Sequence, residues 1–152
     1  MYAPQGHELL RKSYRCVMMN SVTEFITKSQ IQYLSTVGLD GNPKVRPFQF
    51  MLEEDGRLYF CTSNQKKVYK EMKANPHVEL CATGEHFSWI RLSGQVVFSD
   101  DMEIKARIQE SNELVKSIYQ TPNNPVFEIF YLADATAVIA DFSGNPPRTV
   151  TI

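Results

Sequence analysis

The chain has 152 residues, of which 43% are hydrophobic and 22% are charged, with a formal net charge of −1. This length predicts one domain, and the composition is ordinary for a globular protein with a single core. A net charge so close to zero argues against broad binding to nucleic acid or to an anionic membrane surface. No run of eighteen apolar residues is present and the first residues lack a signal-peptide pattern, so neither a membrane span nor secretion is expected.

The three cysteines, Cys16, Cys61 and Cys81, are irregularly spaced and form no Cys-x-x-Cys motif. An odd number of isolated cysteines favours a reducing cytoplasm over a disulfide framework, and no metal site is predicted from this spacing. Cys61 is expected to be a small buried hydrophobe rather than a reactive thiol.

Alternation of apolar and polar residues predicts a series of short strands. In chain order they cover residues 30–37, 43–53, 57–62, 78–83, 88–98, 126–132 and 135–142. The first three are joined by turns at Asp40-Gly41-Asn42 and Asp55-Gly56, whose residues tolerate positive φ. The last two are expected to form a hairpin around Ala133-Asp134.

Helices are predicted over residues 20–28, 65–74 and 100–118. The first and last begin with capping boxes, Asn20 or Ser21 with Glu24 and Asp100 with Glu103. This pattern divides the chain into an N-terminal extension (1–17), one domain (18–142) and an irregular C-terminal tail (143–152). Hairpin connections between most strands exclude a doubly wound parallel sheet. They predict a mainly β fold, an antiparallel barrel with flanking helices.

The stretch from Leu58 to Lys70 carries the strongest functional signal. An apolar strand leads into the hydroxyls of Thr62 and Ser63, and then into a helix that begins with Lys66 and Lys67. A helix N-terminus carries partial positive charge and unpaired N–H groups, so cations there are normally disfavoured. Two lysines make sense at this place if an anion such as phosphate binds between them. The alternative is that both lysines simply point into water.

Two further strands carry polar or aromatic residues that a core does not need. Arg46 is a permanently charged, planar donor suited to phosphate, and Pro47 predicts a sheet edge or bulge with free backbone groups. The alternative is a surface arginine on an ordinary edge strand. In the fifth strand, one face combines Phe87, Trp89 and Arg91, which is typical of a subunit contact or a ligand wall.

Together these segments resemble the pyridoxamine-phosphate-oxidase-like flavoproteins over roughly residues 21–142. The resemblance is carried by Tyr33-Leu-Ser-Thr-Val, Gly41-Asn-Pro-Lys-Val-Arg-Pro-Phe48, Leu58-Tyr-Phe-Cys-Thr-Ser with Lys66-Lys67-Val-Tyr-Lys70, and Asn75-Pro-His-Val-Glu-Leu80. Members of this family are split β-barrels that form dimers and bind FMN in two clefts between the subunits. The resemblance therefore implies a split barrel, FMN as cofactor and a homodimer here.

The resemblance also implies which residues contact the cofactor. They are Arg46, Pro47, Phe48, Thr62, Ser63, Lys66 and Lys67 of one subunit, with Trp89 and Arg91 of the other. The charged and hydroxyl side chains of the first set would surround the phosphate and ribityl chain, and the backbone from Arg46 to Phe48 would face the isoalloxazine ring. With this resemblance the phosphate interpretation is preferred to the solvated lysines. No catalytic side chain is identified.

Within the family the likeness is greatest to small nitroimidazole-resistance-like flavoproteins. Pyridoxamine-phosphate oxidases end in an Arg-Leu-x-Pro type sequence, whereas this chain ends Pro147-Arg-Thr-Val-Thr-Ile152, which argues against vitamin B6 oxidation. Nitroimidazole-resistance members tend to have histidine where this chain has Cys61. The expected function is an FMN-dependent oxidoreductase of unknown substrate and electron donor. A non-catalytic FMN carrier or redox sensor is the alternative, and a haem-binding relative ranks last because no histidine is a convincing ligand.

Overall fold

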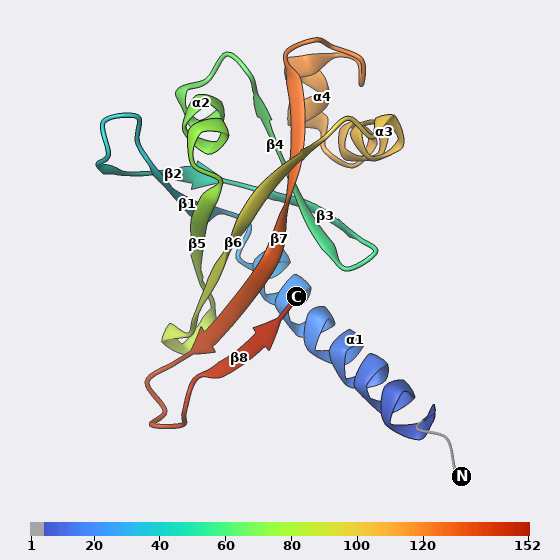
Figure 1. Cartoon of the computed structure of the whole chain (residues 1–152), viewed down its shortest axis with the longest axis vertical. Coiled ribbons are helices and arrows are strands. Elements are labelled where there is room, and N and C mark those ends of the chain that lie inside the picture. Colours follow the sequence, from blue (N-terminus) through green and yellow to red (C-terminus); the bar gives the residue numbers. More distant parts are fainter. Residues whose placement is uncertain (1–4) are drawn as a thin grey trace.

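The computed structural model describes residues 5–152, which form one curved antiparallel sheet with helices packed against it (Figure 1). The strands are β1 (Gln32–Val37), β2 (Pro43–Phe48), β3 (Phe50–Glu54), β4 (Arg57–Ser63), β5 (His77–Thr83), β6 (Trp89–Ser99), β7 (Phe127–Ala140) and β8 (Arg148–Thr151). The helices are α1 (Gln5–Lys28), α2 (Lys67–Ala74), the short 3-10 helix η1 (Glu85–Phe87), α3 (Met102–Ser111) and α4 (Glu113–Tyr119). The predicted mainly β class with flanking helices is confirmed.

The strand order is β2-β1-β5-β6-β7-β4-β3, with β8 paired to β7 beside this path. The two ends of the path, β2 and β3, are separated in sequence by Gln49 alone, so the chain itself joins the two sheet edges. Gln32, which is fully buried, bridges this junction: its Nε2 donates to the carbonyl of Ile26 at 2.8 Å, and its Oε1 accepts from the Phe50 N–H at 2.6 Å. The edge position that Pro47 predicts for its strand is therefore observed.

The two faces of the sheet differ in their surroundings. Directly opposed residues of neighbouring strands share a face, and the row Leu34, Leu80, Leu92 and Ala137 is buried in the main core. The second half of α1 covers this core with Met19, Val22 and Ile26. A smaller cluster around Tyr59, Phe127 and Ile129 packs with α3 and α4. The elements that carry the predicted site residues are thus fixed by two packed clusters.

The N-terminal part differs from the sequence-based expectation. The sequence predicts an N-terminal extension over residues 1–17, of which 1–4 lie outside the described residues, yet α1 begins at Gln5 and runs without interruption to Lys28. No glycine or proline interrupts the sequence from residue 7 to residue 28, so the helix started by the packed second half can continue. Figure 1 shows the first half projecting away from the barrel. Helix α1 crosses the boundary expected at residue 17. The division into an extension, one domain and a tail stays a prediction.

The C-terminal part differs as well. The expected hairpin around Ala133-Asp134 is wrong, because β7 runs through both residues as one strand. Asp134 has a φ of +49°, next to a register shift in the pairing of β6 with β7, so the turn-forming residue makes a bulge. The tail is not irregular throughout: β8 pairs with β7, with Val150 buried opposite Ala137.

The predicted helix over residues 100–118 is divided in two. Asn112 has extended backbone angles and separates α3 from α4. Its side-chain Oδ1 accepts from the Val115 N–H at 3.1 Å and so caps α4. An amphipathic stripe alone does not reveal such a break, because the apolar period continues across it.

Candidate functional site

Arg46 lies in β2 opposite Leu34, on the face of the sheet that is turned toward the core. Its Nη1 donates to Thr36 Oγ1 at 2.5 Å and its Nη2 to Glu71 Oε2 at 2.6 Å. Thr36 Oγ1 donates to the same Glu71 oxygen at 2.6 Å, which closes a three-membered network. The Glu71 side chain is 7% exposed and the Arg46 side chain 23%. Helix α2 is therefore joined directly to the arginine strand.

Sequence reasoning missed Thr36 and Glu71. The signal for Glu71 was present, because it lies next to Met72 and three positions after Val68, and both are on the buried side of α2. A carboxylate on the buried side of a helix needs a partner. Nothing in the amino-acid pattern indicates which cation is that partner.

Lys66 and Lys67 are exposed at the start of α2. Lys66 occupies the N-cap position without a side-chain capping hydrogen bond, and the first turn of the helix contains no acidic residue. Among the ion pairs formed by residues 5–152, none involves either lysine. The first turn of α2 thus combines free cations with N–H groups that no side chain caps.

The two hydroxyl residues stand at the end of β4, immediately before this helix. Ser63 Oγ accepts from the Gln65 N–H at 3.2 Å, while the buried Thr62 Oγ1 has no partner within the described chain. A buried hydroxyl without a partner costs about 1–3 kcal/mol, so a buried hydroxyl normally has a hydrogen-bond partner. Hydroxyls, uncapped N–H groups and two lysines fit the phosphate of a cofactor such as FMN.

Trp89 and Arg91 lie on the face of the sheet opposite to the face that carries Arg46. Arg91 lies opposite Cys81, which lies opposite the exposed Tyr33, and this row is on the outer face of the sheet. Arg91 Nε is 3.8 Å from Glu79 Oε1, and both side chains are about half exposed. Trp89 contacts Phe142, with ring centroids 5.2 Å apart. Within one chain, the fold places the Trp89–Arg91 pair and the Arg46 network on opposite faces.

Pro47 and Phe48, the remaining two predicted residues, lie on opposite faces of the sheet. Pro47 is exposed and lies opposite Tyr33 on the outer face. Phe48 packs against the core, with its ring 5.9 Å from that of Phe130 in an edge-to-face arrangement. Along β2, Arg46 and Phe48 therefore face the core side and Pro47 the outer side.

Cys61 lies in β4 and packs against the cluster beneath α3 and α4. Burial raises the pKa of its thiol to about 12, although the nearby Lys66 ammonium acts in the opposite direction. Burial also raises the pKa of Tyr119 to about 12. Cys61 is partly buried, and this environment favours the neutral thiol.

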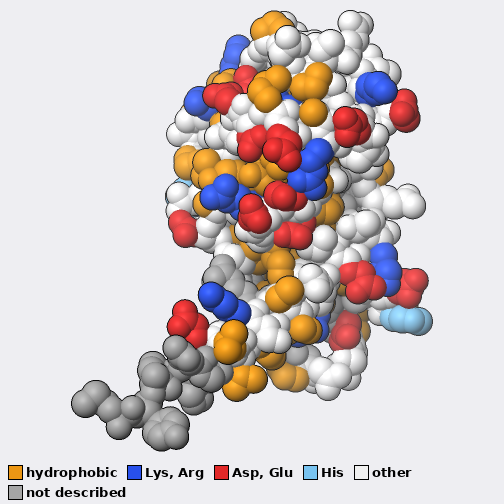
Figure 2. Space-filling model, turned by 90° about the vertical axis from the view of Figure 1, so that its right-hand side faces the viewer, with side chains coloured by type: hydrophobic (Ala, Val, Ile, Leu, Met, Phe, Trp, Pro, Cys, Tyr) orange, Lys and Arg blue, Asp and Glu red, His pale blue; other side chains and the backbone are white. Residues whose placement is uncertain are grey.

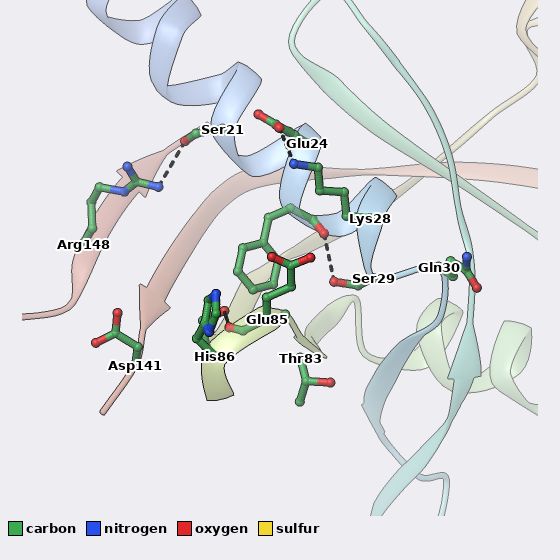
Figure 3. Close-up of a pocket in the computed structure, with 13 residues that line it drawn as sticks. Ser21, Glu24, Lys28, Ser29, Gln30, Thr83, Glu85, His86, Asp141 and Arg148 are labelled. Atoms are coloured by element: carbon green, nitrogen blue, oxygen red, sulfur yellow. Dashed lines mark hydrogen bonds and ion pairs between the residues drawn. The ribbon is translucent and has the colours of Figure 1, made fainter. Parts of the chain in front are cut away.

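A separate hollow of about 900 Å³ is lined by the second half of α1, η1 and the start of β8 (Figure 3). On its wall, Lys28 Nζ pairs with Glu24 Oε1 at 2.6 Å, and Arg148 Nη2 donates to Ser21 Oγ at 3.4 Å. The nine residues expected to contact the cofactor all lie outside this lining. The hollow and the candidate cofactor site thus share no residue, although Ser88 of the hollow directly precedes Trp89.

The surface and helices bear on possible partners. On the face that Figure 2 shows, acidic and basic side chains are interspersed, so this face has no region of one sign that would attract a polyanion. Within residues 5–152, no helix is both long and apolar enough to cross a membrane.

Comparison with known proteins identifies the class of protein. The family model for pyridoxamine 5'-phosphate oxidase matches residues 18–138, and the chain therefore belongs to this family of split-barrel proteins. The expected family and fold are confirmed. No curated protein shows a significant match to the chain.

Three solved structures are similar to this chain. A NimC/NimA family protein from Clostridium acetobutylicum has 31% sequence identity and a TM-score of 0.81, with 88% of this chain and 92% of that chain covered. A pyridoxamine 5'-phosphate oxidase-related, FMN binding protein from Nostoc punctiforme has 18% identity and a TM-score of 0.61, with 97% and 89% covered. A heme binding protein from Mycobacterium smegmatis has 13% identity and a TM-score of 0.66, with 82% and 54% covered. The last two show a shared fold alone.

Proposed function

We propose that this protein is a homodimeric, cytoplasmic FMN-binding flavoprotein that acts as an oxidoreductase. The observation that carries the proposal is the start of α2, where Lys66 and Lys67 form no ion pair with an acidic residue of the described chain and lie beside the Thr62 and Ser63 hydroxyls. Family membership supports it, and so does the FMN-binding relative from Nostoc punctiforme, which has the same fold.

Each group has a definite role in this proposal. Lys66 and Lys67 neutralise the phosphate, and Thr62 and Ser63 donate to its oxygens or to the ribityl hydroxyls. Arg46 supplies a further cation from β2, and the backbone from Arg46 to Phe48 faces the isoalloxazine ring. Bound FMN supplies the electron chemistry, because its ring system can take up a hydride and pass it on.

The placement of the residues is the reason why the proposed site needs a second subunit. Because Trp89 and Arg91 lie on the opposite face of the sheet from Arg46, one chain cannot present both sets to one ligand. In a dimer, the outer face of one subunit supplies Trp89 and Arg91 to the flavin that the other subunit holds. Phe142, which is 81% exposed in the single chain, contacts Trp89 and extends this aromatic surface, whereas Phe87, expected on the same strand face, lies in η1 just before β6.

The test begins with the purified protein and its absorption spectrum. A retained flavin, identified as FMN after release, supports the proposal, whereas a haem Soret band would replace it with the haem-binding alternative. Equilibrium titration should then show tighter binding of FMN than of riboflavin, which lacks the phosphate. Equal affinity for the two flavins would refute the phosphate site.

The carrier or sensor alternative makes a different prediction for electron transfer. An oxidoreductase must be reduced by a donor at a useful rate, whereas a carrier or sensor need not be. Anaerobic addition of NADH or NADPH to the holoprotein, followed by flavin absorbance, separates the two. Bleaching within seconds supports the enzyme, and a flavin that stays oxidised with every donor supports the carrier.

A further inference from the structure

We propose that Glu71 is a positioning residue that holds Arg46 by one edge of its guanidinium and leaves the other edge for the ligand phosphate. This inference rests on the proposed binding of FMN. It starts from the geometry of the network: Glu71 Oε2 and Thr36 Oγ1 both contact the terminal nitrogens of Arg46, at 2.6 Å and 2.5 Å.

A guanidinium has two edges that can each donate a pair of hydrogen bonds. One edge consists of the two terminal nitrogens, and the other of Nε with one of them. Glu71 and Thr36 occupy the terminal edge. Among the hydrogen bonds found in residues 5–152, none uses Nε of Arg46, so the second edge is available for a bidentate bond to phosphate.

Because Glu71 is buried, stabilisation of the fold does not by itself explain why Glu71 pairs with Arg46. Glu71 is almost completely buried, and removing a carboxylate from water carries a desolvation cost that can equal or exceed the gain from pairing. The bond that Thr36 donates to the same oxygen fixes the carboxylate further. Such a network gives Arg46 one orientation, which a binding site needs more than a core does.

The charges of the cluster point to the same ligand. Lys66, Lys67 and Arg46 provide three positive charges, and Glu71 cancels one of them. The remaining two match a terminal phosphate, which carries about −1.5 to −2 near neutral pH. Glu71 lies four residues after Lys67, about 6 Å along the axis of α2, and Arg46 is joined to this helix by its ion pair with Glu71.

The experiment compares FMN and riboflavin affinities in Glu71→Ala, in the milder Glu71→Gln and in the wild type. We expect Glu71→Ala to weaken FMN at least about tenfold while riboflavin changes less than about twofold. Glu71→Gln should lose less, because its amide oxygen can still accept from Thr36 and Arg46. Glu54→Ala is the matched control, since Glu54 pairs with Arg107 at the same 2.6 Å but on a different, more exposed surface. It should leave the ratio of the two affinities unchanged.

A second comparison separates positioning from folding. If Glu71 acts through Arg46, then Glu71→Ala should change the FMN-to-riboflavin ratio no further in an Arg46→Ala background. Equal weakening of both flavins, an unchanged FMN affinity, or tighter FMN binding would each overturn the inference while leaving FMN binding established. A wild type that binds no FMN would overturn the proposed function and this inference together. Because the flavins are compared within each variant, a Glu71→Ala protein that is only less stable does not mimic the expected result.

Discussion

Trp89 and Phe142 lie against each other on the outer face of the sheet, with ring centroids 5.2 Å apart, although Phe142 is 81% exposed. Trp89 is on β6 and Phe142 follows the end of β7, so the contact joins two neighbouring strands at one end of the barrel. An aromatic pair of this kind, with one ring so exposed, is unusual on a monomer surface. It is the part of the outer face that we expect a second subunit to cover.

The first prediction is that Phe142→Ser shifts the protein from dimer toward monomer. Removing the ring takes away apolar surface that the proposed dimer buries, and each fully buried large side chain contributes about 1.5–3 kcal/mol. Sedimentation velocity at micromolar concentration measures the change. Leu114→Ser is the control, because Leu114 is similarly exposed but belongs to α4. A wild type that sediments as a monomer while holding FMN would contradict the dimer.

The second prediction concerns the lysines at the start of α2. Lys66→Ala with Lys67→Ala should weaken FMN far more than riboflavin, since charge-assisted hydrogen bonds contribute about 1.5–3 kcal/mol each and the loss should exceed tenfold. Titration of each flavin into the apoprotein measures this. The control removes the same charge from the same helix at Lys70 and Lys73, which lie farther from its N-terminus. A similar loss in the control would indicate a general charge effect instead of a phosphate site.

Much of the fold follows from local patterns, and the departures have local causes. Alternation places the strand β1 and separates Tyr33 and Val37 from Leu34 and Thr36, but it does not reveal that Tyr33 and Val37 are on the exposed side. Alternation cannot distinguish a tight turn from a bulge, however, and Asp134 has the positive φ that both use. The strand β8 was missed because its stability comes from pairing with β7 and not from its own short sequence.

In the candidate site too, some residues are revealed by local sequence patterns and others are not. Lys66, Lys67 and the preceding hydroxyls are contiguous, so a sequence motif reveals them. The partnership of Arg46 with Glu71 spans 25 positions and depends on how α2 packs on the sheet. The side of the sheet on which Trp89 lies is readable from alternation, whereas its partner across a subunit boundary is not.

The third prediction is that the stability of the protein falls as the pH rises from about 9 to about 12, and that Cys61 contributes to this fall. Burial raises the pKa of the Cys61 thiol from 9.0 to about 12, so in this window the unfolded chain releases a proton that the folded protein retains. The folded state then binds more protons than the unfolded state, and the free energy of unfolding decreases as the pH increases. The contribution is complete below pH 9 and is lost through about pH 12.

Urea unfolding midpoints measured across this range check the third prediction. Cys61→Ala should make the decline shallower, while Cys16→Ala, at an exposed cysteine, should leave the slope unchanged. Tyr119, whose pKa burial also raises to about 12, keeps part of the decline in the Cys61 variant. Identical slopes in the wild type and the Cys61 variant would show that the thiol is not the responsible group.

The last prediction separates flavin binding from turnover. If the cleft beside the flavin admits a second planar molecule, Trp89 of the neighbouring subunit is the wall against which that molecule stacks. Stacking contributes about 0.5–1.5 kcal/mol beyond burial, which is enough to change the affinity for a donor or acceptor without releasing the cofactor.

Trp89→Ala should therefore retain FMN within a fewfold of the wild-type affinity and alter the rate of anaerobic flavin bleaching by NADH or NADPH. Leu114→Ala is the comparison, because Leu114 is exposed on α4 and belongs neither to the cofactor site nor to the proposed dimer surface. If Trp89→Ala loses FMN as severely as the double lysine variant, Trp89 belongs to the cofactor site itself. An unchanged bleaching rate with FMN still bound would remove Trp89 from the path of the electron donor.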